Sequence, residues 1–131
     1  MIGPIHHIEL WVADLPAALE SFGWLLPELG WSTENSWPGG HSWRLGDTYL
    51  VTTTTPTLTS SEHQRRAPGL NHLALHAGPA SNVDRLMKLA VDHGWSPLYS
   101  DRYPHAGGPD HYAGYLENAS GFKIELVAEE S

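Results

Sequence analysis

The chain has 131 residues, of which 40% are hydrophobic and 17% charged, a composition typical of a folded globular protein and not of a disordered segment. Its formal net charge is −8 with only seven lysines and arginines, which argues against binding duplex nucleic acid, since such a surface needs basic residues to replace counterions. The absence of cysteine excludes disulfides, thiolate metal sites and a cysteine nucleophile. No leader or membrane-spanning apolar run is evident, so we expect a cytoplasmic protein without a membrane partner.

The first predicted strand, residues 5–12, separates polar from apolar side chains between its two faces. Alternation along a strand places Leu10 and Val12 on one face, with His7 and Glu9 on the other. The apolar face requires a helix to cover it. The opposite face carries an imidazole and a carboxylate, which are candidate functional groups.

A helix is predicted to follow this strand directly. Asp14 is a favourable N-cap, Pro16 is tolerated in the first turn, and Pro27 is expected to break the helix. Apolar residues at helical spacing between these positions form the face that would cover the sheet. Turn residues then separate three strand-like runs, at about 31–35, 41–45 and 48–54.

The second half of the chain repeats this order. A strand at 70–77 places His72 and Leu73 on opposite faces, and Ser81 or Asn82 is expected to cap the helix that follows. Three further strand-like runs complete the half, at about 96–100, 111–117 and 122–128.

The repeat predicts an α+β fold of two strand–helix–three-strand (βαβββ) modules, each forming a cupped mixed sheet. The first module covers about residues 1–55 and the second about 70–131, and the polar, proline-containing segment 56–69 links them into a single domain, 1–131. One helix cannot cover both faces of a sheet, so two such modules are expected to meet over their uncovered faces and to form a shared cavity.

Three residues on the faces predicted to be free of helix form a candidate metal site. His7 and His72 occupy equivalent positions in the two repeats, and Glu125 lies on the last strand. Two imidazoles and one carboxylate are the ligands of non-haem iron(II) sites, and they also suit manganese, nickel or zinc. Any one of these side chains alone is ordinarily a solvated polar residue. The equivalence of the two histidines is what favours a divalent metal ion as the cofactor.

Three segments resemble the signature segments of a known family: HHIELWVADLPAALESF, GLNHLALHA and GYLENASGFKIELV. They are similar to the vicinal oxygen chelate superfamily, which includes glyoxalase I, extradiol dioxygenases, fosfomycin-resistance thiol transferases and bleomycin-resistance proteins. The resemblance spans both halves and implies paired modules with a metal between them, held by His7, His72 and Glu125. It also implies a homodimer with shared sites, in which His7 of one subunit joins His72 and Glu125 of the other.

Three further residues are candidates for catalysis. By the resemblance, Tyr115 matches the tyrosine that precedes the last-strand glutamate by ten positions in extradiol dioxygenases and fosfomycin-resistance enzymes, and it would hydrogen-bond the reacting oxygen. Glu9, on the same face as His7, and His111, which shares the parity of Tyr115, are candidates to move a proton, although a surface position would also explain each. The carboxylate that is the fourth ligand in glyoxalase I has no counterpart in residues 48–55.

Two functions from different classes are consistent with these residues. The first is a divalent-metal enzyme of isomerase, lyase or dioxygenase type, acting on a small oxygen-rich substrate chelated to the metal. The alternative is a non-catalytic protein, similar to bleomycin-resistance proteins, that sequesters an aromatic or cationic compound in the dimer cleft. The negative charge and the six tryptophans suit such a ligand. Trp11 and Trp43 are expected to line the pocket, unless they belong to the core or an interface. A structural dimer without a ligand is the third interpretation.

Overall fold

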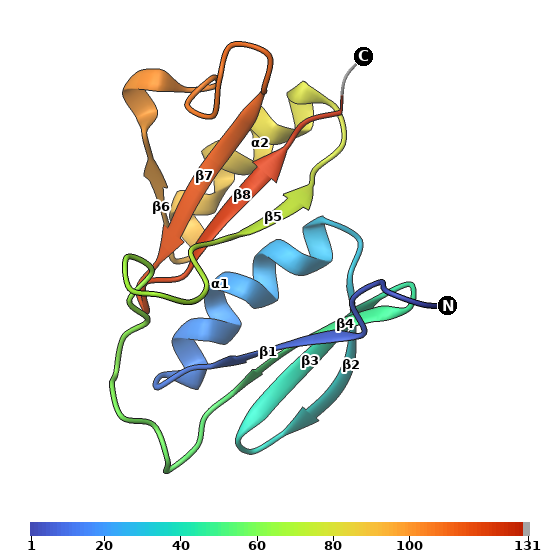
Figure 1. Ribbon diagram of the computed structural model, residues 1–131, viewed down its shortest axis with the longest axis vertical. Coiled ribbons are helices and arrows are strands. Elements are labelled where there is room, and N and C mark those ends of the chain that lie inside the picture. Colours follow the sequence, from blue (N-terminus) through green and yellow to red (C-terminus); the bar gives the residue numbers. More distant parts are fainter. Residues whose placement is uncertain (130–131) are drawn as a thin grey trace. The chain divides into compact units, whose positions relative to one another are not determined.

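The computed structural model describes residues 1–129, which form two compact units divided between His63 and Gln64 (Figure 1). Each unit contains a four-stranded mixed sheet and one α-helix, in the order strand, helix, three strands. The predicted α+β fold of two βαβββ modules is therefore confirmed. No helix within the described part of the chain is long and apolar enough to span a membrane.

The first unit contains β1 (His7–Trp11), α1 (Leu15–Glu28), β2 (Ser32–Trp37), β3 (Gly40–Leu45) and β4 (Thr48–Thr53). Its sheet has the order β1-β4-β3-β2, with β1 parallel to β4 and the other neighbours antiparallel. A parallel pair requires a crossover, and α1 provides it while packing against β2, β3 and β4. The helix thus covers one face of the sheet.

Helix α1 begins where the sequence predicts. The Asp14 carboxylate accepts a hydrogen bond from the Ala17 amide, 3.0 Å away, and so satisfies one of the free N–H groups of the first turn. Pro27 was expected to break the helix, but it lies inside the last turn and the helix ends one residue later, at Glu28. The buried face of the helix consists of Ala18, Ser21, Phe22, Leu25 and Leu26.

Trp43 belongs to the core of the first unit. Its side chain is 1% exposed, and a Cβ atom at Gly23 of α1 would lie 3.8 Å from its ring. The prediction that Trp43 lines a ligand pocket is therefore wrong, because β3 directs this residue to the helix-covered face. Trp11, by contrast, is 48% exposed.

The second unit repeats the arrangement with two additional short 3₁₀ helices, η1 and η2. Its elements are β5 (Leu73–His76), α2 (Ala80–Leu89), η1 (Ala90–His93), β6 (Trp95–Leu98), η2 (Ser100–Arg102), β7 (Ala113–Asn118) and β8 (Lys123–Val127). The sheet order is β5-β8-β7-β6, and only β5 and β8 are parallel. β8 is consequently hydrogen-bonded on both sides.

Two local predictions in this unit differ from the structure. Neither Ser81 nor Asn82 caps α2: the N-cap residue is Pro79, without a side-chain cap, and the Asn82 amide instead donates to the Ala77 carbonyl at 2.8 Å. The strand expected from residue 111 begins only at Ala113. His111 therefore lies in the loop that precedes β7, where alternation along a strand does not determine the direction of its side chain.

Alternation does place the candidate residues of β1 and β8 away from the helices. Leu10 is buried while His7 and Glu9 are exposed, as expected. In β8 the polar residues Lys123 and Glu125 alternate with apolar ones, yet both are buried. Two polar side chains in the central part of the second sheet are thus removed from water, and their partners define the site.

Candidate functional site

Glu125 lies in the middle of β8 with a strand on each side. Its register partners are Ala74 in β5 and Tyr115 in β7. Residues directly opposite each other in neighbouring strands project to the same face, so the tyrosine ring and the carboxylate are adjacent. The small side chain of Ala74 leaves the other flank of Glu125 open to residues that come from outside the strands.

Two histidines contact this carboxylate from different segments. His72, immediately before β5, places Nε2 3.0 Å from Oε1 of Glu125, and Nε2 of His111 contacts Oε2. The Glu125 side chain is 8% exposed, against 31% for His72 and 39% for His111. The carboxylate is therefore the buried floor of the cluster, and the two imidazoles lie between it and solvent.

The environment adjusts the acidity of both central groups. Burial is the largest influence on Glu125 and opposes its ionisation, but the hydrogen bonds and charges of His111 and His72 together outweigh burial and lower the pKa of the carboxyl group. Burial, followed by the negative charge of Glu125, raises the pKa of the Tyr115 hydroxyl. The site thus presents an ionised carboxylate beside a phenol that keeps its proton.

Asn71 determines which nitrogen of His72 carries the proton. The Asn71 side-chain amide donates through Nδ2 to the Arg65 carbonyl at 3.0 Å, so its Oδ1, 2.6 Å from Nδ1 of His72, is left as an acceptor. Nδ1 of His72 must then be the donor, and in a neutral imidazole Nε2 carries the lone pair. That lone pair faces an anionic oxygen of Glu125. Two acceptors at this distance require either a second proton on the ring or a bound cation.

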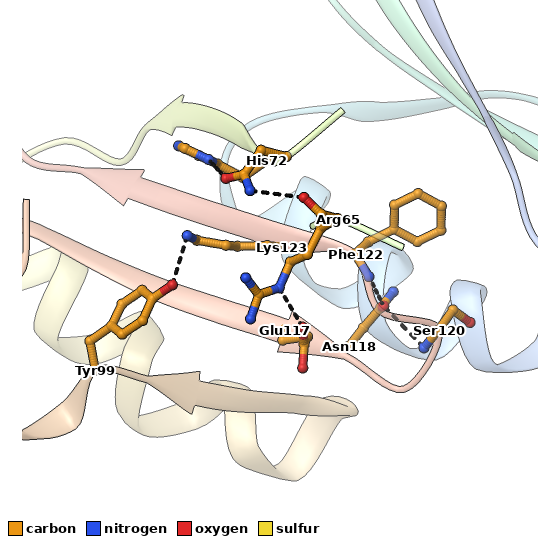
Figure 2. Close-up of polar contacts among 9 residues, drawn as sticks. Arg65, His72, Tyr99, Glu117, Asn118, Ser120, Phe122 and Lys123 are labelled. Atoms are coloured by element: carbon orange, nitrogen blue, oxygen red, sulfur yellow. Dashed lines mark hydrogen bonds and ion pairs between the residues drawn. The ribbon is translucent and has the colours of Figure 1, made fainter. Parts of the chain in front are cut away.

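Lys123 occupies the same face of β8, two residues before Glu125. Its Nζ atom donates to the Tyr99 hydroxyl at 2.9 Å and lies 4.9 Å and 5.1 Å from the ring centroids of Tyr99 and Tyr115. Figure 2 shows this contact together with the nearby ion pair of Arg65 with Glu117, whose Nε and Oε2 atoms are 2.7 Å apart. The ammonium is held largely by aromatic faces and one hydroxyl.

The loop between η2 and β7 is tied down around His111. The hydroxyls of Tyr103 and Tyr112 both donate to one carboxylate oxygen of Asp84, on α2. A Cβ atom at Gly107 would lie 2.7 Å from the Tyr115 hydroxyl and 2.7 Å from Cδ2 of His111. The close approach of the Gly107 backbone leaves no room for a side chain, so this loop positions the imidazole against the sheet.

The remaining predicted site residues belong to the first unit. His7 is exposed, stacks on Tyr49 with ring centroids 4.7 Å apart, and places Nδ1 2.9 Å from Nδ1 of His6. The Glu9 carboxylate accepts a hydrogen bond from Nε1 of Trp11 at 2.8 Å. Within the second unit the structure brings together four of the six predicted residues, His72, His111, Tyr115 and Glu125, and the other two, His7 and Glu9, lie in the first unit.

Sequence reasoning missed three contributors to the cluster. Lys123 shares the parity of Glu125 on β8, and that signal was sufficient to find it. Asn71 adjoins His72, but its role depends on the Arg65 carbonyl, which lies in the segment predicted to be a linker. Tyr99 follows β6 with a left-handed backbone, φ 57°, which strand periodicity does not anticipate.

The donor chemistry of the cluster suits a divalent cation. Within residues 1–129 no three histidine, aspartate or glutamate side chains are arranged as a ready metal site. Nevertheless, an imidazole with a fixed tautomer and an ionised carboxylate are ligands of first-row divalent metals. His72 and Glu125 would hold such an ion, and the convergence of Nε2 and Oε1, 3.0 Å apart, is the structural observation that fits it.

Comparisons with known proteins agree with this architecture. The profile of the Glyoxalase/Bleomycin resistance protein/Dioxygenase superfamily matches residues 6–115. The chain is 43% identical over 126 residues to the uncharacterized protein YqjT of Bacillus subtilis, and the matched region covers 95% of this chain and 98% of that protein.

Solved structures extend the comparison. A candidate glyoxalase from Bacillus halodurans is similar with a TM-score of 0.92 and 40% identity, covering 98% of this chain and 97% of that one. The lactoylglutathione lyase of Agrobacterium tumefaciens shares the fold alone, with a TM-score of 0.64 and 17% identity over 95% of this chain and 92% of that one. On the sequence match and the repeated βαβββ architecture together, the chain belongs to the glyoxalase/bleomycin resistance/dioxygenase superfamily, the vicinal oxygen chelate proteins.

Proposed function

We propose that the protein is a cytoplasmic, divalent-metal-dependent enzyme that acts on a small, oxygen-rich substrate. The observation that carries the proposal is the His72–Glu125 pair, in which Asn71 orients the imidazole so that its Nε2 atom lies 3.0 Å from Oε1 of the buried carboxylate. With a neutral His72 ring this contact would oppose two acceptors, and either a second ring proton or a bound cation satisfies it. A cation shared between them removes that conflict.

The bound ion, iron, manganese, nickel or zinc, would supply Lewis acidity toward adjacent substrate oxygens. The chain's own groups account for the remaining chemistry. Tyr115, whose pKa is raised, donates a hydrogen bond to the reacting oxygen. His111 reaches solvent on one side and Glu125 on the other, so it can move a proton between substrate and water. Glu9 of the first unit is the second proposed base.

The reaction belongs to the isomerase, lyase or dioxygenase types found in this superfamily. The relative from Bacillus halodurans described as a candidate glyoxalase supports an oxygenated substrate. The strand that supplies a fourth ligand in glyoxalase I corresponds to β4, whose residues Thr48–Thr53 include neither a carboxylate nor an imidazole. We therefore propose chemistry that requires no fourth protein ligand from this strand.

The metal requirement has a direct test in His72→Ala. We expect the wild-type protein, supplemented separately with each of the four metals and desalted, to retain about one ion per chain by inductively coupled plasma mass spectrometry. His72→Ala should lose the ion, because Glu125 then has no imidazole opposite Oε1. His76→Ala is the matched control, since His76 is an exposed histidine on the same strand, β5, and should bind as wild type.

The outcome against the proposal is equally direct. A wild-type protein that stays free of metal after supplementation, and whose thermal stability does not respond to a chelator, would eliminate the enzyme proposed here. Saturable quenching of tryptophan fluorescence by a cationic drug, unaffected by chelator, would then favour sequestration of the bleomycin-resistance type.

We further propose that the third ligand, His7, comes from a second copy of the chain. A shared site predicts a specific complementation result. His7→Ala and His72→Ala should each lose the metal alone, whereas a refolded equal mixture should recover about a quarter of the wild-type sites, because each mixed dimer contains one intact site. Metal content of the mixture measures this. No recovery, with dimers present by light scattering, would show that each site is built within one chain.

A further inference from the structure

Lys123 carries a buried charge that has no anionic partner among the residues that the structure describes. The residue is 8% exposed, yet among the ion pairs of residues 1–129 none includes its ammonium group. Its one hydrogen bond goes to the neutral Tyr99 hydroxyl. An ammonium has three donors, so two remain for other acceptors.

Burying an ammonium is unfavourable unless an anion or several acceptors compensate. The rings of Tyr99 and Tyr115 provide partial compensation through their faces. The other nearby carboxylate on this face, Glu117, is already paired with Arg65 at 2.7 Å, as Figure 2 shows. The arrangement therefore holds a cation ready for an anion that residues 1–129 do not supply.

Tyr99 adds a second donor at the same place. Its oxygen accepts a hydrogen bond from Lys123 and lies beside the Arg65 guanidinium, and since neither cation can accept a hydrogen bond, the Tyr99 O–H remains a donor for another group. The left-handed backbone at this residue, φ 57°, is unfavourable for a tyrosine and is retained where the ring packs edge-to-face against Tyr115 and contacts the Lys123 ammonium. An ammonium and a hydroxyl thus lie side by side, 2.9 Å apart.

We propose that Lys123 and Tyr99 form a binding site for the oxyanion group, a carboxylate or a phosphate, of a small ligand. Lys123 and Glu125 project to the same face of β8, and Tyr115 contacts both residues. One molecule therefore reaches the oxyanion site with its charged group and the His72–Glu125 pair with its other oxygens. This second statement rests on the proposed function, and it narrows the substrate class to oxygenated acids or phosphate esters.

The test uses the metal-free full chain with inorganic phosphate and with acetate, followed by two-dimensional amide NMR. The wild type should show saturable shifts centred on residues 98–100 and 122–125. Lys123→Met should weaken phosphate binding at least about tenfold, while Lys123→Arg stays within about threefold because the charge is retained. Lys88→Met is the matched control: Lys88, the other lysine of the chain, is exposed on α2 and should leave the affinity unchanged.

Several results would overturn the site. They are the absence of saturable shifts in the wild type at tens of millimolar anion, shifts centred elsewhere, or wild-type affinity in Lys123→Met. If Lys123→Met does not give a folded spectrum, the proposal is tested by the wild-type shift map and by the phosphate affinity of Lys123→Arg. The anion test is independent of metal binding because it uses the metal-free protein. Phosphate binding in a protein that never binds metal would therefore overturn the proposed function and leave the oxyanion site standing. Metal binding without an anion response would overturn this inference alone.

Discussion

Glu125→Gln is expected to weaken divalent metal binding by at least about a hundredfold while leaving the fold intact. The glutamine amide keeps the shape of the carboxyl group and can still hydrogen-bond His72 and His111, but it lacks the negative charge. Competition with a chromophoric chelator measures the affinity, and the amide NMR spectrum checks the fold. Metal binding that survives this substitution would remove Glu125 from the ligand set.

The same substitution should change how the metal-free protein responds to acid. The pKa of Glu125 is lowered from its ordinary value of 4.5, so near and below that pH the unfolded chain binds more protons than the folded chain. The contribution of this group to stability is therefore complete above about pH 4.5 and is lost as pH falls through the lower pKa of the folded state.

Urea unfolding at a series of pH values between about 3 and 7 measures this dependence. Wild type should lose stability more steeply toward acid than Glu125→Gln does. Glu20→Gln, which changes an exposed carboxylate on α1, should follow the wild-type curve. Parallel curves for wild type and Glu125→Gln would mean that the two histidines do not lower the pKa of the carboxyl group.

Trp43→Ala should reduce the free energy of unfolding by about 3 to 5 kcal/mol. Its indole is 1% exposed and fills the space between β3 and α1, so truncation removes apolar contacts and leaves a cavity. Urea denaturation monitored by far-ultraviolet circular dichroism measures the change. Trp11→Ala is the matched control at a 48% exposed tryptophan and should cost less than about 1 kcal/mol. Equal losses for the two variants would contradict the assignment of Trp43 to the core.

The repeated architecture of this protein could be predicted from the sequence because its causes are local. Asp14 supplies an acceptor for a helix start, Gly30 and Gly94 provide positive φ angles after helices, and alternation separates His7 from Leu10. Each effect acts within a few residues. These local effects determine the order of the elements and most of their boundaries, and they also determine which face of the last strand carries Glu125.

The sequence by itself determined the two modules and singled out an acidic residue on a helix-free face; only the tertiary structure decided what surrounds that residue. His111 reaches Glu125 from a loop, Arg65 orients Asn71 from a segment predicted to be a linker, and Lys123 becomes buried between tyrosines. These contacts join residues that are remote in the chain, and their free energies depend on burial and hydrogen-bond geometry that no periodic pattern encodes. Local propensity thus specified the scaffold, and long-range packing created the charges and donors of the site.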